Sequence, residues 1–381
     1  MMVYSVPLNS ILRNVKLSEF SIKTEGTYPI YSKWFSSKLD NFTDSIMMLE
    51  SSYESDTSLI DSAMNVYRGT IEFNPAKSLI KHFIENQEFT GVTSYTRYWH
   101  GYLVLLKPLL FIVDYGKIRM INGLVQIITV LLICIVMIKK ELKEYIISFL
   151  LMYLMLMPLV LIKSIQFSTC FYVFLWGIMA ILLIDKSELE RFIEIVFLVL
   201  RIMTSYVDLL TYPITTFGIP MAFYLLVNKN DSVEKKLMDM VVLGFYWCIG
   251  FGGMWISKWL IACVTAGYNI FDATSQMSYW SSAKQESLFP TISVGLSNYQ
   301  AFLKTPFSIL TLVILIILIK KKTKLNGRLN NRKNLLPFLL LSLAPAVWYA
   351  FAKGHSDVHY WFTNKACSVS FISLLFAFFS L

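Results

Sequence analysis

The feature that most constrains this chain is a series of apolar runs, each close to the length of a membrane-spanning helix. A helix needs about 20 apolar residues to cross a bilayer, and fewer when Lys or Arg side chains at its ends reach the interface. Such runs occupy residues 118–138, 146–162, 166–184, 191–209, 214–227, 237–264, 306–320, 335–352 and 366–381. The sequence therefore predicts an all-α fold, a polytopic transmembrane helix bundle of about nine or ten spans.

The composition excludes most other classes of protein. Of the 381 residues, 56% are hydrophobic and only 15% are charged, and the mean hydropathy is +0.56, which is too apolar for a water-soluble domain. The net charge of +9 comes largely from short basic loops between apolar runs, so we expect membrane lipids rather than nucleic acid as partners. The five cysteines lie within or beside apolar runs and predict neither a disulfide framework nor a zinc site.

The distribution of Lys and Arg predicts the orientation, because basic residues in short loops stay in the cytoplasm. Alternate connections are basic, with three, two, three and seven Lys and Arg residues in 139–145, 185–191, 228–236 and 320–334. We therefore expect a multi-pass protein of the cell membrane with a cytoplasmic C-terminus. The segments expected outside are 13–100, the connection near Lys163, 208–213, 265–305 and 353–365.

This topology divides the chain into two parts. Residues 1–117 are expected to hold a partial first span, an extracytoplasmic loop region and an interfacial helix, and residues 118–381 the transmembrane bundle. The segment 98–115 is apolar with aromatic ends but is interrupted by Lys107-Pro108, which suits an interfacial helix and leaves a tenth span as the alternative. The start MMVYSVPLNSIL is too short to cross the membrane, so a truncated N-terminus is expected.

All four histidines fall on the expected outer side, and two of them form the strongest local motif. His355 and His359 lie four residues apart with Asp357 between them, a spacing that puts both imidazoles on one face of a helix. A divalent cation is a candidate cofactor here, although the motif lacks the general-base Glu of a zinc protease. Interfacial capping and the binding of a phosphate or sugar are the alternatives.

A pair of carboxylates stands in the N-terminal region at Asp40 and Asp44. Two carboxylates four residues apart can act as a base with its supporting acid, or can bind a divalent cation together with a lipid phosphate. Asp44 can equally cap a helix that begins near Ser45, a common role for Asp.

Charged side chains inside apolar runs are costly and therefore mark candidate binding residues. Arg201 lies within the fourth run, Asp208 follows seven residues later on the same helical face, and Lys258 lies in the sixth run. Arg201 and Lys258 are the natural partners of a phosphate or diphosphate headgroup. An ion pair between Arg201 and Asp208 is the structural alternative.

A further candidate segment combines a cation with aromatic rings at Arg97, Trp99 and His100. Aromatic faces beside polar groups commonly bind carbohydrate, although the aromatic belt of a membrane interface has the same composition.

This layout resembles the GT-C glycosyltransferases, polytopic enzymes that use polyprenyl-phosphate sugars on the outer face of a membrane. The shared features are the early outer carboxylates Asp40 and Asp44, the interfacial segment 98–115, the many spans and a late outer loop rich in aromatic residues. Three blocks, at 98–102, 208–213 and 355–362, also look like those of poorly characterised bacterial multispan proteins.

The resemblance implies transfer of a sugar from a polyprenyl-phosphate donor to an extracytoplasmic acceptor. Asp44, ranked before Asp40, would take the proton of the acceptor hydroxyl. Arg201 and Lys258, with His355 or His359, would stabilise the leaving phosphate. A polysaccharide polymerase shares this chemistry and stays open, and a flippase is disfavoured because the inner halves of the spans carry almost no charge.

Overall fold

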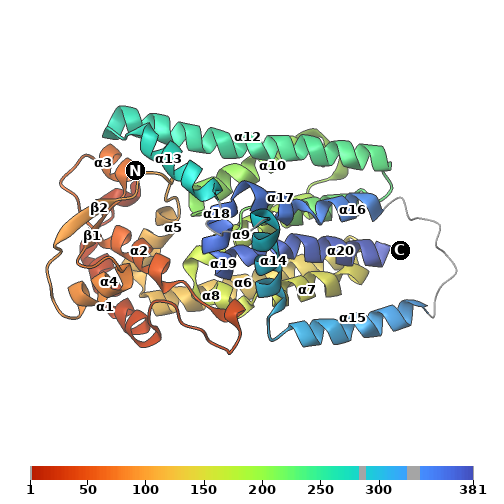
Figure 1. Cartoon of the computed structure of the whole chain (residues 1–381), viewed down its shortest axis with the longest axis horizontal. Coiled ribbons are helices and arrows are strands. Elements are labelled where there is room, and N and C mark those ends of the chain that lie inside the picture. The colour runs from red at the N-terminus through yellow and green to blue at the C-terminus, as the bar shows by residue number, and fades with distance from the viewer. Residues whose placement is uncertain (1, 283–288, 324–334, 381) are drawn as a thin grey trace.

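The computed structural model describes residues 2–282, 289–323 and 335–380, which form a long helical bundle with a smaller helical region at one end (Figure 1). The N-terminus lies in the smaller region and the C-terminus at the opposite end of the bundle (Figure 1). The described residues contain one sheet, the antiparallel pair β1 (Tyr67–Thr70) and β2 (Gly91–Ser94). The expected all-α fold class is confirmed.

The smaller region, residues 2–112, has its own core. Its helices are α1 (Leu8–Glu25), α2 (Asn41–Ser52), α3 (Leu59–Asn65), α4 (Pro75–Phe83) and α5 (Leu103–Ile112). Val15, Met48, Leu79 and Leu106 are among the buried side chains that pack them together. Local signals start these helices: the Asn74 side chain accepts hydrogen bonds from the first backbone N–H groups of α4, for example.

The bundle consists of the remaining helices. They are α6 (Tyr115–Lys139), α7 (Ile146–Met155), α8 (Pro158–Lys163), α9 (Ile165–Leu183), α10 (Lys186–Val207), α11 (Thr215–Val227), α12 (Val233–Ala266), α13 (Ile270–Ser281), α14 (Pro290–Leu303), α15 (Ser308–Thr323), α16 (Leu336–Leu341), α17 (Ala344–Phe351), α18 (Lys353–Val358), α19 (Tyr360–Thr363) and α20 (Ser368–Ser380). Within the described residues the expected apolar runs fall mostly on helix, but the run 146–162 is broken at Met157, whose φ is +62°, and the run 335–352 is interrupted between α16 and α17.

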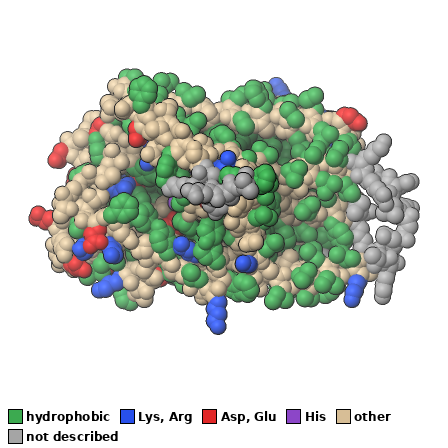
Figure 2. Space-filling view, viewed as in Figure 1, with side chains coloured by type: hydrophobic (Ala, Val, Ile, Leu, Met, Phe, Trp, Pro, Cys, Tyr) green, Lys and Arg blue, Asp and Glu red, His purple; other side chains and the backbone are tan. Residues whose placement is uncertain are grey.

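Four stretches of helix in the described residues are long and apolar enough to cross a membrane: α6, α9, α12 and the segment Tyr360–Ser380. A fifth exists if α14 and α15, which meet at a bend of 81°, count as one span. The other expected spans correspond to helices that are shorter, such as α11, or that carry more charge, such as α10. Figure 2 shows mostly hydrophobic side chains over the bundle and most of the visible acidic side chains over the smaller region.

The N-terminal residues are largely helical. They form α1, an amphipathic helix whose Ile11, Val15 and Ile22 are buried while Leu17 and Phe20 are exposed. Helix α1 packs on α4 and α5. A helix does form in the segment expected at the interface, where α5 includes Pro108.

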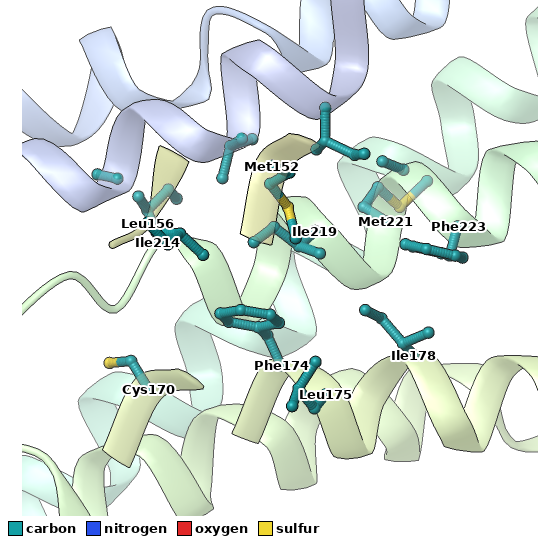
Figure 3. Packing of buried hydrophobic residues seen from close by; sticks show 14 of the residues in the cluster. Met152, Leu156, Cys170, Phe174, Leu175, Ile178, Ile214, Ile219, Met221 and Phe223 are labelled. Atoms are coloured by element: carbon teal, nitrogen blue, oxygen red, sulfur yellow. The ribbon is translucent and has the colours of Figure 1, made fainter. Parts of the chain in front are cut away.

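The bundle core gathers where α9 and α11 pack against α7 and α20, with Met152, Phe174, Ile219 and Phe223 among its side chains (Figure 3). Two glycines allow this approach. A Cβ added at Gly218 would lie 2.3 Å from the Val369 side chain, and one at Gly177 would lie 2.7 Å from Pro220. Small residues at such crossings let helix backbones pack closely.

We expect Gly218→Ala to lower the free energy of unfolding by about 1–3 kcal/mol, because the branched Val369 side chain leaves no room for a methyl group. Gly252→Ala is the matched control: nothing lies within 4 Å of the added Cβ, so that variant should gain up to ~1 kcal/mol from helix propensity. Unfolding of the two purified variants in detergent measures the difference. Equal stability in both variants would contradict the packing at Gly218.

Candidate functional site

A cavity of about 810 Å³ lies where the smaller region meets the bundle. Its walls come from α2, both strands, the start of α9 and the helices α13, α18 and α19. Polar groups and aromatic rings alternate around it. The polar or charged lining includes Asp40, Thr43, Arg68, Arg97, Gln166, His355 and His359, and the aromatic lining includes Tyr28, Phe42, Tyr95, Tyr98, Trp280, Trp361 and Phe362.

Asp40 brings a carboxylate to this cavity at the N-terminus of α2. It caps the helix, since its side chain accepts hydrogen bonds from the backbone N–H of Thr43 at 3.1 Å and from the Thr43 hydroxyl at 3.0 Å. Burial, assisted by the neighbouring carboxyl of Asp44, raises the pKa of Asp40 to about 7. A cavity carboxylate with a pKa near neutrality has the property that a general base needs.

Asp44, for which the sequence left a catalytic role and a helix cap open, lies outside the cavity lining. The helix begins at Asn41, one turn earlier than expected, so Asp40 is the cap. Asp44 is fully buried and accepts hydrogen bonds from the hydroxyl of Tyr115 and from the backbone N–H groups of Ile165 and Gln166 at 3.2 and 3.1 Å. It therefore caps α9 from a neighbouring helix and does not line the cavity.

His355 and His359 come together as their spacing predicts, with ring centroids 4.9 Å apart. Both rings also contact Trp280, and both line the cavity. Burial, together with the neighbouring His359 ring, lowers the pKa of His355 well below its usual range, so this imidazole is neutral. Gly354 permits the arrangement, because a Cβ there would lie 2.2 Å from the carbonyl oxygen of Ser282 at the end of α13. Asp357 does not line the cavity.

Of the segment 97–100, which was expected to bind carbohydrate, only part lies at the cavity. Arg97 lines the cavity, but Trp99 and His100 do not. The indole N–H of Trp99 donates to the carbonyl of Met254, 2.7 Å away, and attaches the segment to α12. His100 is buried, and its Nδ1 lies 3.2 Å from a carboxylate oxygen of Glu50.

Arg201 and Lys258, the charged residues within apolar runs that we expected to bind phosphate, lie outside the cavity lining. Arg201 is buried against aromatic rings, with its guanidinium carbon 4.4 Å from the centroid of Trp247 and 3.9 Å from that of Phe251. Lys258 donates from Nζ to the carbonyl of Met64 at 2.7 Å. Neither residue lines the cavity, so their positive charges are held by rings and by a backbone carbonyl instead.

Asp208 also lies outside the cavity lining. Its carboxylate accepts hydrogen bonds from the hydroxyl of Thr169 and from the backbone N–H of Thr211, both at 2.8 Å. No hydrogen bond or ion pair joins it to Arg201 among the described residues. The alternative ion pair between Arg201 and Asp208 is therefore replaced by contacts that each side chain makes separately.

A second, apolar groove of about 390 Å³ adjoins the cavity. It runs between α12, α13 and α17, and Arg97, Tyr98, Trp280 and His355 line both hollows. The rest of its lining is largely apolar, including Leu210, Phe251, Trp255, Ile256, Trp259, Met277 and Phe351. A ligand that fills both the cavity and the groove would have a polar part and a hydrocarbon part that meet beside Arg97.

Several lining residues carried no signal in the sequence. Arg68 lies on β1 and Gln166 at the start of α9, and only the tertiary fold brings them to the cavity. Lys38 stands beside it, with Nζ 4.1 Å from the centroid of Trp361 and 4.5 Å from that of Tyr28. These contacts join the loop around Lys38 to helix α19, two segments more than 300 residues apart.

Within the described residues, no group of three or more His, Cys, Asp or Glu side chains is arranged to hold a metal ion. His355 and His359 could offer two ring nitrogens to a divalent cation, whose other ligands would then come from substrate or water. The chain matches no family model, no curated protein and no solved structure.

We expect Asp44→Asn to lower the free energy of unfolding by about 1–3 kcal/mol, because an amide –NH₂ must then face donors at a fully buried site. Asp40→Asn should change stability little, since Asn caps a helix about as well as Asp. Thermal unfolding of both variants measures the contrast. If Asp44→Asn proves as stable as Asp40→Asn, Asp44 is not the anchor of α9.

Proposed function

We propose that this protein is a multi-pass membrane glycosyltransferase that moves a sugar from a polyprenyl-phosphate donor to an extracytoplasmic acceptor. One observation carries the proposal: a polar cavity with a buried carboxylate adjoins an apolar groove, and an arginine lines both of them. A lipid-linked sugar has this same division between a polar head, a phosphate and a hydrocarbon chain.

The groove lies beside surfaces that suit the hydrocarbon of a bilayer. On α12, Val264 is 86% exposed and Ile256 is 56% exposed, and both are apolar. A prenyl chain could therefore reach the groove sideways from the membrane, with its phosphate near Arg97 and its sugar among the aromatic rings of the cavity. The short basic loops favour a cytoplasmic C-terminus, so the cavity faces outward in this proposal.

The transfer step uses Asp40 as the base. The acceptor oxygen attacks C1 of the sugar while Asp40 takes its proton, and the bond from C1 to the phosphate oxygen breaks. The electron pair of that bond stays with the phosphate, whose growing negative charge the cavity arginines Arg68 and Arg97 stabilise. Asp40 thus takes the role that the resemblance assigned first to Asp44, because Asp40 lines the cavity and Asp44 does not.

Product analysis tests the reaction class. The full-length protein in lipid nanodiscs is given a polyprenyl-phosphate sugar carrying a radiolabel in the sugar, together with a mixture of envelope glycan acceptors. Addition of one labelled sugar supports the transferase. Repeated addition identifies a polymerase, the second candidate, which the volume of about 810 Å³ favours because it has room for more than one sugar. No covalent change would overturn both.

We expect Asp40→Asn to slow transfer by ~100- to 10,000-fold, the usual contribution of a general base. The amide keeps the cap on α2, so the protein should fold and accumulate normally. Asp56→Asn, a change at an exposed carboxylate outside the cavity, is the matched control. Full activity in Asp40→Asn at normal abundance would remove Asp40 from the mechanism and leave Asp44 and the histidine pair as candidates.

The raised pKa of Asp40 predicts the pH profile. The base form accumulates as the pH rises through about 7, so kcat/KM should rise about tenfold per pH unit below 7 and level off above it. His355→Gln should not move this limb, because that imidazole is already neutral. Stability gives an independent check: burial favours the protonated carboxyl, so its contribution is lost as the pH rises through 7, and Asp40→Asn should remove that dependence.

A further inference from the structure

Two arginines share one aromatic ring in the wall of the cavity. The guanidinium carbon of Arg68 lies 5.7 Å from the centroid of Tyr95, and that of Arg97 lies 5.5 Å from the same centroid. The backbone fixes this arrangement, because Arg68 pairs with Thr93 in the two-stranded sheet and the N–H of Tyr95 donates to the carbonyl of Asn65 at 2.8 Å. Two planar donors thus contact the same ring and line the same cavity.

The two arginines differ in how their charge is balanced. Arg68 lies 3.5 Å from the buried carboxylate of Glu50, which also accepts a hydrogen bond from the hydroxyl of Tyr102. Nη1 of Arg68, the atom that faces Glu50, is buried and makes no hydrogen bond within the described residues, while the Arg68 side chain as a whole stays 15% exposed. Arg97 forms no ion pair with a described carboxylate. Both side chains line the cavity, where an anionic ligand could pair with them, and Glu50 holds Arg68 in place.

Their positions also differ along the path of a lipid-linked ligand. Arg97 lines both the cavity and the apolar groove, whereas Arg68 lines the cavity alone. A phosphate attached directly to a prenyl chain in the groove would meet Arg97 first. A second phosphate, one bond further toward the sugar, would then meet Arg68.

We infer that the donor is linked through a diphosphate rather than a single phosphate, with Arg97 on the phosphate next to the lipid and Arg68 on the phosphate next to the sugar. This inference rests on the proposed function, because it needs a lipid-linked donor in the groove. Arg68 is then the residue that determines specificity for the second phosphate.

The test compares ligands on the full-length protein in nanodiscs. Equilibrium binding is measured for farnesyl monophosphate and farnesyl diphosphate, and inorganic pyrophosphate competes against the latter. Arg68→Gln should weaken binding of the diphosphate lipid by at least about tenfold and that of the monophosphate lipid by less than about twofold. Arg97→Gln should weaken both. Arg13→Gln, at an exposed arginine outside the cavity and groove, should change neither.

Arg68→Lys is the control for a folding defect. It keeps the positive charge and should lose only part of the affinity for the diphosphate lipid. Equal weakening of both lipids in Arg68→Gln, or no weakening, would overturn the diphosphate inference and leave the proposed function standing. Competition by pyrophosphate as strong as that of unlabelled farnesyl diphosphate would show a site for free diphosphate and overturn the lipid part. Binding of neither lipid would contradict the proposed function itself.

Discussion

The arrangement of the cavity depends on one buried carboxylate, that of Asp44. It stands on α2 in the smaller region, yet its hydrogen-bond donors belong to the bundle: the Tyr115 hydroxyl at the start of α6 and two backbone N–H groups at the start of α9. Those N–H groups have no partner within their own helix. This side chain is one of the contacts that join the two parts of the molecule, together with those of Trp99 and Lys258, and Asp40 lies one helical turn before it on α2.

The helices were predictable from the sequence to the extent that local hydrophobicity determines them. Apolar runs located the long helices, because a segment of about 20 apolar residues has few other conformations open to it. The sequence did not predict the break at Met157 or the short helices α16 to α19, because these features depend on packing between segments far apart in the chain. The start of α2 was misplaced by one turn, which exchanged the roles of Asp40 and Asp44.

The sequence predicted residues of the candidate site only where a charged or titratable side chain stands near an apolar run. Asp40, Arg97, His355 and His359 stand out as charged or titratable groups near apolar runs, and all four line the cavity. The same reasoning fails for charges such as Arg201 within those runs. A buried cation in the sequence suggests an anionic ligand. In the structure, aromatic rings contact the Arg201 guanidinium instead, and no sequence pattern predicts that contact.

Asp44, which caps α9, and Asp40, the proposed base, are coupled through electrostatics as well as through their positions on α2. Burial is the larger cause of the raised pKa of Asp40, and the carboxyl of Asp44 adds to it. Hydrogen bonds from Thr43 act in the opposite direction and keep the pKa near 7. A contact that attaches the smaller region to the bundle therefore also helps to set the proton affinity of the cavity carboxylate. A fold without the Asp44 anchor would lose the position of Asp40 and part of the field that tunes it.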